Sequence, residues 1–151
     1  MLRVLVVCTA NICRSPASEW FLRLALGDRK VIVESAGVLA TEGNHADLTI
    51  QQLMMERGID GLSAHRSRCL LPSFVRKYQL ILCMEKMHML SIRRADPVAV
   101  GKTMLLGHWE GQKEVQDPVG ESVDVYKNAL LEIERFSQQW ANKIVTSGMI
   151  E

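Results

Sequence analysis

The sequence lacks a surplus of charge of either sign and a long apolar run. Its 151 residues include 18 lysines and arginines against 17 aspartates and glutamates, a formal net charge of +1. This balance argues against a general nucleic-acid or membrane surface, so any anion binding must be local. No segment approaches the roughly 18 consecutive apolar residues that a spanning helix needs, so no membrane insertion is expected.

Neither a signal peptide nor a dense cysteine framework is expected from the sequence. The opening apolar run, residues 4–7, is short and is not followed by a small-residue cleavage site. The four cysteines, at positions 8, 13, 69 and 83, do not form the framework of a small secreted protein. Reduced thiols and a cytoplasmic location are therefore expected. No second close pair of Cys or His accompanies Cys8 and Cys13, so we expect neither zinc nor another cofactor.

What is present is typical of one globular domain. Apolar residues make up 48% of the chain and charged residues 23%, enough for one core and a polar surface. No internal repeat, low-complexity tract or linker divides the sequence, which predicts a single domain over residues 1–151.

Hydrophobic periodicity predicts an α/β fold. Short apolar runs at residues 3–8, 31–35, 78–84 and 102–106 are typical of buried strands. Helical spacing of apolar residues appears at 16–27, 46–58 and 85–94, and from 121 onward as about six amphipathic turns. Strands that alternate with helices predict a parallel sheet covered on both faces. Residues 107–120 lack periodicity, and a loop of this length is often functional.

The segment VCTANICRSP, residues 7–16, joins the first strand to the first helix. Ligands of open α/β sheets bind at this position, where free backbone N–H groups and a positive helix end attract anions. Pro16 suits the first helical position, which would make Ser15 the N-cap. The loop amides, the helix end and Arg14 all favour the thiolate of Cys8 over its thiol.

These parts suit displacement at phosphorus. The Cys8 thiolate would attack, while amides and the planar Arg14 guanidinium hold the equatorial oxygens. A cysteine followed six residues later by arginine is a weak signal alone, since about 0.3 occurrences per chain arise by chance. The preceding strand, the following serine and the helix strengthen it. The alternative is that Cys8 ends a strand as a small apolar residue and Arg14 is a surface charge.

The leaving group of such a reaction needs a proton donor. Two Asp-Pro pairs are candidates, Asp96-Pro97 and Asp117-Pro118. Asp117 is favoured because it lies in the long irregular loop before the last helix, where proline can fix the local backbone. Both pairs are also compatible with a plain turn.

The sequence resembles the low-molecular-weight protein tyrosine phosphatases. VCTANICRS and the downstream Asp117-Pro118 match the family's motifs, and ESAG, AHRSR, LILCMEKMH and GKTMLLGHW resemble its bacterial branch, which is tied to capsule and exopolysaccharide production. The resemblance implies a four-stranded parallel sheet flanked by helices on both faces, with a phosphate-binding loop between the first strand and the first helix. It implies as substrate a phosphotyrosine-containing protein, a bacterial tyrosine autokinase being expected, with inorganic phosphate as the product.

The resemblance also implies roles for individual residues. Cys8 becomes the phosphocysteine, Arg14 binds phosphate, and Asp117 acts as general acid and then general base. Ser15 donates a hydrogen bond to the thiolate, and Asn11 adopts a left-handed conformation braced by Ser35 and His65. The substrate would contact Thr9, Ala10, Asn11, Ile12, Cys13, Ser15, Leu39 and Val119. Cys13 would form a reversible disulfide with Cys8 under oxidation.

One departure concerns the substrate pocket. The family usually has an aromatic residue directly after Asp-Pro, whereas this chain has Val119. Stacking on a phenyl ring is weakened on that side, and the opposite wall is expected from Leu39. Trp109 and His45 are further candidates for a surface that contacts the substrate. Phosphate esters other than phosphotyrosine therefore stay open as substrates.

Two other functions are compatible with parts of the sequence. An arsenate reductase of the same fold would also use a loop thiolate, but it needs two further relay cysteines, and none follows Cys83 within ten residues. A non-catalytic phosphate-binding module would require the loss of the nucleophile, the arginine or the acid, and all three are present.

Overall fold

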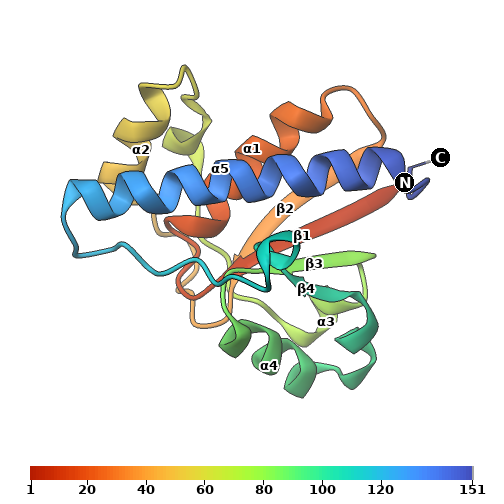
Figure 1. Ribbon diagram of the computed structural model, residues 1–151. Coiled ribbons are helices and arrows are strands. Elements are labelled where there is room, and N and C mark those ends of the chain that lie inside the picture. Colours follow the sequence, from red (N-terminus) through yellow and green to blue (C-terminus); the bar gives the residue numbers. More distant parts are fainter. Residues whose placement is uncertain (151) are drawn as a thin grey trace.

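The structure, a computed structural model, describes residues 1–150. Residue 151, the last of the predicted domain, lies outside the described residues. Four parallel strands form one sheet in the order β2-β1-β3-β4 (Figure 1). These strands are β1 (Leu2–Cys8), β2 (Val31–Gly37), β3 (Leu80–Cys83) and β4 (Thr103–Leu105). The predicted α/β class with a four-stranded parallel sheet is confirmed.

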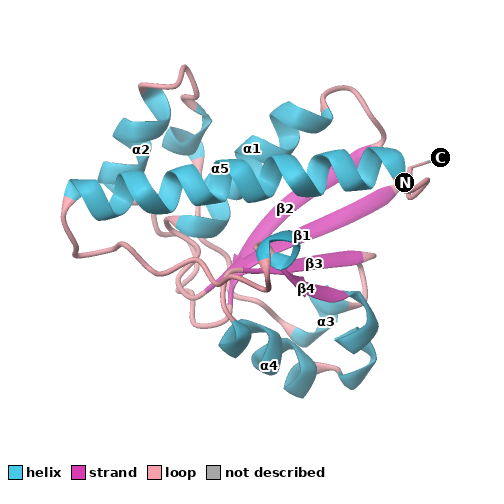
Figure 2. Cartoon of the chain, in the orientation of Figure 1, coloured by secondary structure: helices cyan, strands magenta, loops and turns pink. Residues whose placement is uncertain are grey.

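Helices cover both faces of this sheet (Figure 2). The α-helices are α1 (Arg14–Leu26), α2 (Leu48–Met55), α3 (Pro72–Val75), α4 (Lys86–Ala95) and α5 (Val123–Thr146). Helices α1, α2 and α5 lie on one face, and α3 and α4 lie on the other (Figure 1). Alternate residues of β1 enter two separate hydrophobic cores, Val4 and Val6 on the α1/α5 side and Leu5 and Val7 on the α4 side. Burial on both faces explains why β1 is a continuous apolar run.

Three 3₁₀ segments were not predicted: η1 (Gly61–Ala64), η2 (Pro97–Lys102) and η3 (His108–Glu110). Segments of three to six residues are too short to show a helical period, which is why sequence patterning missed them. Within residues 1–150, no helix combines the length and apolar character required to cross a membrane.

The start of α1 corrects one prediction. The helix begins at Arg14 rather than Pro16, and its N-cap is Cys13, which makes no side-chain capping bond. Ser15 therefore lies inside the first turn and is not the N-cap. Its hydroxyl instead lies close to Cys8 and Asn11, so the serine stabilises the loop and not the helix end.

The two Asp-Pro pairs lie in different environments. Asp96 caps η2, where its side chain accepts the Val98 N–H at 3.1 Å and an Arg76 N–H at 3.1 Å. Because η2 leads directly into the start of β4, Asp96 lies at the amino-terminal edge of the sheet. The Cys8 loop lies at the opposite, carboxyl-terminal edge of the sheet. Asp96 is therefore a turn residue, which is the second interpretation that the sequence allowed for it.

Candidate active site

The loop between Cys8 and Arg14 encloses a small hollow at the carboxyl end of β1. Strand β1 places Cys8 at the sheet edge, and α1 begins directly at Arg14. Both residues are buried, so Arg14 is not a surface charge. The hollow is lined by Cys8, Ala10, Asn11, Ile12, Cys13, Arg14, Asp117 and Val119.

Asn11 holds the loop in its shape. Its φ of 58° is left-handed, a conformation that asparagine tolerates better than most residues. The side-chain amide donates to Ser15 Oγ at 2.8 Å and to Ser35 Oγ at 3.0 Å. Its Oδ1 accepts the Arg68 backbone N–H at 2.9 Å, and its carbonyl oxygen lies 2.7 Å from His65 Nε2. The structure therefore brings Ser35 and His65 to Asn11.

The end of β2 also contacts the loop. The N–H groups of Val38 and Leu39 donate to the carbonyl oxygens of Cys8 and Thr9, at 3.0 and 2.9 Å. Gly37 permits this approach, since a Cβ at that position would lie 2.4 Å from the Thr9 carbonyl oxygen. The ESAG sequence thus ends β2 with a residue that leaves room for the loop.

The two loop cysteines differ in environment. Ser15 Oγ lies 2.9 Å from Cys8 Sγ, within the range of a hydrogen bond to sulfur. Burial raises the pKa of the Cys13 thiol well above its ordinary value, and the nearby Asp47 raises it further. Cys13 is therefore a protonated thiol at neutral pH.

Arg14 is fixed in place by three partners. Its Nη1 donates to Glu85 Oε2 at 2.7 Å and to the Val115 carbonyl oxygen at 2.7 Å, and its Nη2 donates to Thr9 Oγ1 at 3.4 Å. Guanidinium has five N–H groups. The remaining two, on Nε and Nη2, make no hydrogen bond within residues 1–150. They are available to two oxygens of a tetrahedral anion.

Asp117 reaches the same hollow from the long loop before α5. Its Oδ2 lies 3.9 Å from Arg14 Nη2, and its Oδ1 accepts the Val119 N–H at 3.1 Å. The side chain is 50% exposed. The carboxylate is therefore aimed at the rim of the hollow while it stays in contact with water.

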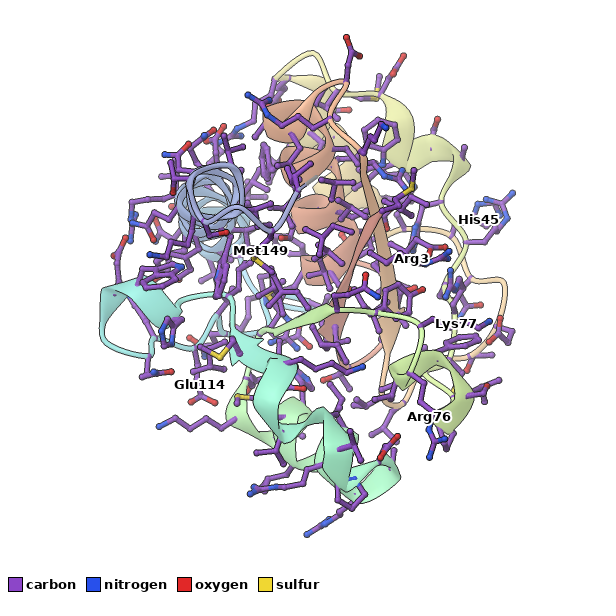
Figure 3. The ribbon with its side chains drawn as sticks, turned by 90° about the vertical axis from the view of Figure 1, so that its right-hand side faces the viewer. Arg3, His45, Arg76, Lys77, Glu114 and Met149 are labelled. Atoms are coloured by element: carbon purple, nitrogen blue, oxygen red, sulfur yellow. The ribbon has the colours of Figure 1, made fainter. Side chains whose placement is uncertain are left out.

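Three of the predicted substrate contacts are not among the residues that line the hollow. Thr9 and Ser15 lie beside it, in hydrogen-bond range of Arg14 and Cys8 respectively, whereas Leu39 is 74% exposed. Only the backbone of Leu39 binds the loop. His45 projects from the periphery of the molecule (Figure 3). Trp109 packs on Trp140 of α5, with 5.2 Å between ring centroids.

Sequence reasoning missed Glu85, the ion-pair partner of Arg14. It directly follows Met84 after β3, and a polar residue after a buried strand is a signal that could have indicated it. Within residues 1–150, no three His, Cys, Asp or Glu side chains lie close enough together to hold a metal ion.

Comparison with known proteins agrees with this geometry. Residues 3–148 match the family described as "Low molecular weight phosphotyrosine protein phosphatase". The chain is 41% identical over 141 residues to the low molecular weight protein-tyrosine-phosphatase Etp of Escherichia coli K12, which covers 93% of each protein.

Solved structures of two phosphatases have the same fold as this chain. The sulphate complex of the tyrosine phosphatase Wzb from Escherichia coli K30 superimposes with a TM-score of 0.89 at 38% identity, covering 95% of this chain and 99% of Wzb. A cysteine-to-serine variant of the arginine phosphatase YwlE, with a phosphorylated active-site serine, gives a TM-score of 0.92 at 27% identity, covering 99% and 100%.

The family match spans almost the whole chain, and Etp and Wzb, which are 41% and 38% identical to it and match along nearly their full length, are named tyrosine phosphatases. The chain therefore belongs to the low molecular weight phosphotyrosine protein phosphatase family and is a phosphoric monoester hydrolase of that type.

Proposed function

We propose that this protein hydrolyses phosphotyrosine in a protein substrate through a phosphocysteine formed on Cys8. The observation that supports this most directly is the meeting of Cys8, Arg14 and Asp117 around one hollow. These residues come from β1, α1 and the loop before α5, and they supply a nucleophile, a fixed positive charge and a carboxyl group.

In the first step, the Cys8 thiolate attacks phosphorus in line with the ester oxygen. The S–P bond forms as the P–O bond to the tyrosine breaks. Protonated Asp117 gives its proton to the departing phenolate oxygen. Arg14 donates its two free N–H groups to the equatorial oxygens, where charge is concentrated in the transition state.

In the second step, water hydrolyses the phosphocysteine. The Asp117 carboxylate takes a proton from the water as its oxygen attacks phosphorus. The S–P bond breaks, and the electron pair returns to Cys8 as thiolate while inorganic phosphate leaves. The phosphorylated serine in the YwlE variant is a stable analogue of such an intermediate in a related phosphatase. Because the chemistry uses side chains alone, activity should survive a chelator.

The expected partner is a bacterial tyrosine autokinase in capsule or exopolysaccharide production, met in the cytoplasm. The similarity to Etp and Wzb, which are both named tyrosine phosphatases, supports a phosphotyrosine protein as substrate. The pathway itself rests on the resemblance to the bacterial branch.

A non-tyrosine phosphate is a second candidate substrate, supported by the composition of the hollow. Its rim carries Val119, and none of its lining residues is aromatic, so a phenyl ring would gain little stacking. The similarity to an arginine phosphatase makes phosphoarginine the specific alternative to test.

Arsenate reduction is disfavoured by the position of Cys83. This thiol belongs to the core on the α4 face, whereas Cys8 belongs to the core on the α1/α5 face. Burial raises the pKa of Cys83 well above its ordinary value. A cysteine that is buried on the other face of the sheet is poorly placed to relay a disulfide from Cys8.

Hydrolysis of para-nitrophenyl phosphate by the wild type, Cys8→Ser and Asp117→Ala tests the mechanism. We expect no turnover without Cys8, and a loss of about 10² or more without Asp117. Undiminished turnover by Cys8→Ser would sink the mechanism, and an unaffected Asp117→Ala would move the acid role elsewhere. Parallel kinetics on phosphotyrosine, phosphoserine and phosphoarginine peptides then decide the substrate class.

A further inference from the structure

A buried imidazole lies directly behind the phosphate-binding loop. His88 is fully buried, and it belongs to α4, on the face of the sheet opposite α1. Its Nε2 lies 2.8 Å from Thr9 Oγ1, and its Nδ1 lies 3.0 Å from the backbone nitrogen of Glu85. A histidine in this position connects the loop to the residue that pairs with Arg14.

The hydrogen bonds fix the tautomer of His88. The Glu85 backbone N–H can only donate, so Nδ1 must be the unprotonated nitrogen that accepts it. The proton of the neutral ring is then on Nε2, which donates to Thr9 Oγ1. Burial and the charge of Arg14 lower the pKa of His88 to about 4, although Glu85, Glu114 and Asp117 oppose this shift. The ring is therefore neutral at neutral pH.

These contacts close a ring of four residues. His88 donates to Thr9, Arg14 donates to both Thr9 and Glu85, and the Glu85 backbone donates to His88. Two donors point at the Thr9 hydroxyl oxygen, which has two lone pairs. Its orientation is thus fixed from both sides. The Thr9 hydroxyl therefore links the loop, Arg14 and α4, alongside the direct contact between Arg14 and Glu85.

We propose that His88 is a positioning residue for phosphoryl transfer, acting through the Thr9 hydroxyl to hold the Arg14 guanidinium in the plane that receives phosphate. This role rests on the proposed phosphatase function. His88 does not line the hollow, so it acts through its neighbours. Glu85 and the Val115 carbonyl oxygen hold Nη1 of Arg14, and the His88–Thr9 pair holds Nη2.

Four variants test the role. In His88→Asn, the shorter amide can still accept the Glu85 N–H but does not reach Thr9. Thr9→Val removes the hydroxyl and keeps the shape, whereas Thr9→Ser keeps the hydroxyl. The double variant His88→Asn/Thr9→Val measures coupling. His108→Asn is the control, because His108 is half-exposed and hydrogen-bonds to Gln112, outside the ring.

We expect His88→Asn and Thr9→Val each to lower kcat for para-nitrophenyl phosphate about tenfold and to weaken vanadate inhibition about equally, with a smaller change in KM. The kcat of the double variant should be no lower than that of the less active single variant. The kcat of Thr9→Ser should stay within about twofold of the wild-type value. Additive losses, or a His88→Asn protein with wild-type kcat and vanadate inhibition, would overturn the proposal.

NMR of the wild-type protein tests the same four-residue set of hydrogen bonds without any variant of His88. Long-range ¹H–¹⁵N spectra should show the Nε2–H tautomer at pH 7, and Thr9→Val should shift the Nε2–H resonance. An Nδ1–H tautomer or a charged ring would refute the proposal even if His88→Asn did not fold. If wild-type protein did not turn over phosphate esters at all, the proposed function would fail. The spectra would still report on the hydrogen bonds among His88, Thr9 and Glu85.

Discussion

The Ser15 hydroxyl lies 2.9 Å from Cys8 Sγ, although one residue belongs to α1 and the other ends β1. Asn11 Nδ2, which can only donate, occupies one lone pair of the same hydroxyl at 2.8 Å. The serine proton is consequently free to point at the sulfur. A hydrogen bond to the charged form stabilises a thiolate.

Replacing Ser15 with alanine should therefore slow the reaction of Cys8. We expect iodoacetate to inactivate Ser15→Ala about tenfold more slowly than wild type at pH 6, because the thiolate loses one charge-assisted hydrogen bond. Loss of activity over time, protected by inorganic phosphate, measures the rate. Ser63→Ala is a control, since the Ser63 hydroxyl donates only to the Asp60 carbonyl oxygen. Equal rates in wild type and Ser15→Ala would contradict this prediction.

Gly37→Ala should damage the loop from outside. The new Cβ would lie 2.4 Å from the Thr9 carbonyl oxygen, so either the loop or β2 must shift. We expect a loss of about 1–3 kcal/mol in the free energy of unfolding and a drop in kcat, measured by urea unfolding and turnover. Gly101→Ala is the matched control, because its Cβ would meet no atom within 4 Å. Similar behaviour of the two variants would show that the contact is unimportant.

An aromatic residue at position 119 should improve binding of phenyl phosphates. Val119 lines the hollow and is 41% exposed, so an aromatic side chain has room at the rim. Val119→Tyr should lower KM for para-nitrophenyl phosphate and phosphotyrosine peptides severalfold, as expected for an added aromatic contact of about 0.5–1.5 kcal/mol. KM for a phosphoserine peptide should not fall. Val98→Tyr, which adds the same side chain at an exposed position of η2, should leave KM unchanged for both kinds of substrate.

Acid should destabilise the protein through His88. Its pKa is about 4 in the folded state and 6.5 ordinarily, so the unfolded chain binds a proton first as pH falls. The stability that the neutral ring contributes is present above pH 6.5 and is lost as pH falls toward 4, by about 2 kcal/mol at pH 5. Urea unfolding from pH 7 to pH 5 should show a smaller loss for His88→Asn than for wild type or His108→Asn. Identical losses would contradict the assignment.

Oxidation should link Cys8 to Cys13, and faster at higher pH. Peroxide converts the Cys8 thiolate to a sulfenic acid, and the Cys13 thiolate then attacks that sulfur and expels hydroxide. Because the pKa of Cys13 is raised, its thiolate fraction grows with pH throughout the neutral range. Mass spectrometry should detect more linkage at pH 8.5 than at pH 6.5, and none in Cys13→Ser. A sulfonic acid on Cys8 beside free Cys13 at both pH values would argue against the disulfide.

The local parts of the site could be read from the chain because they are close together in sequence. Cys8, Asn11, Arg14 and Ser15 lie within eight positions, and the strand before them and the helix after them follow from periodicity. The α/β class follows from the alternation of apolar patterns. The start of α1 could not be predicted, because Ser15 is equally suited to an N-cap and to the hydrogen bond that it makes with the loop.

The residues that complete the site are distant in sequence, and packing brings them together. Glu85 reaches Arg14 across 71 positions and His88 reaches Thr9 across 79, because β3 lies beside β1 in the sheet. Asp117 meets Arg14 only because the loop before α5 folds over the same edge. Leu39 faces solvent because the path of the chain after β2 places it there. Periodicity shows which face of an element is buried, whereas the order of strands and the path of the loops decide which buried residues meet.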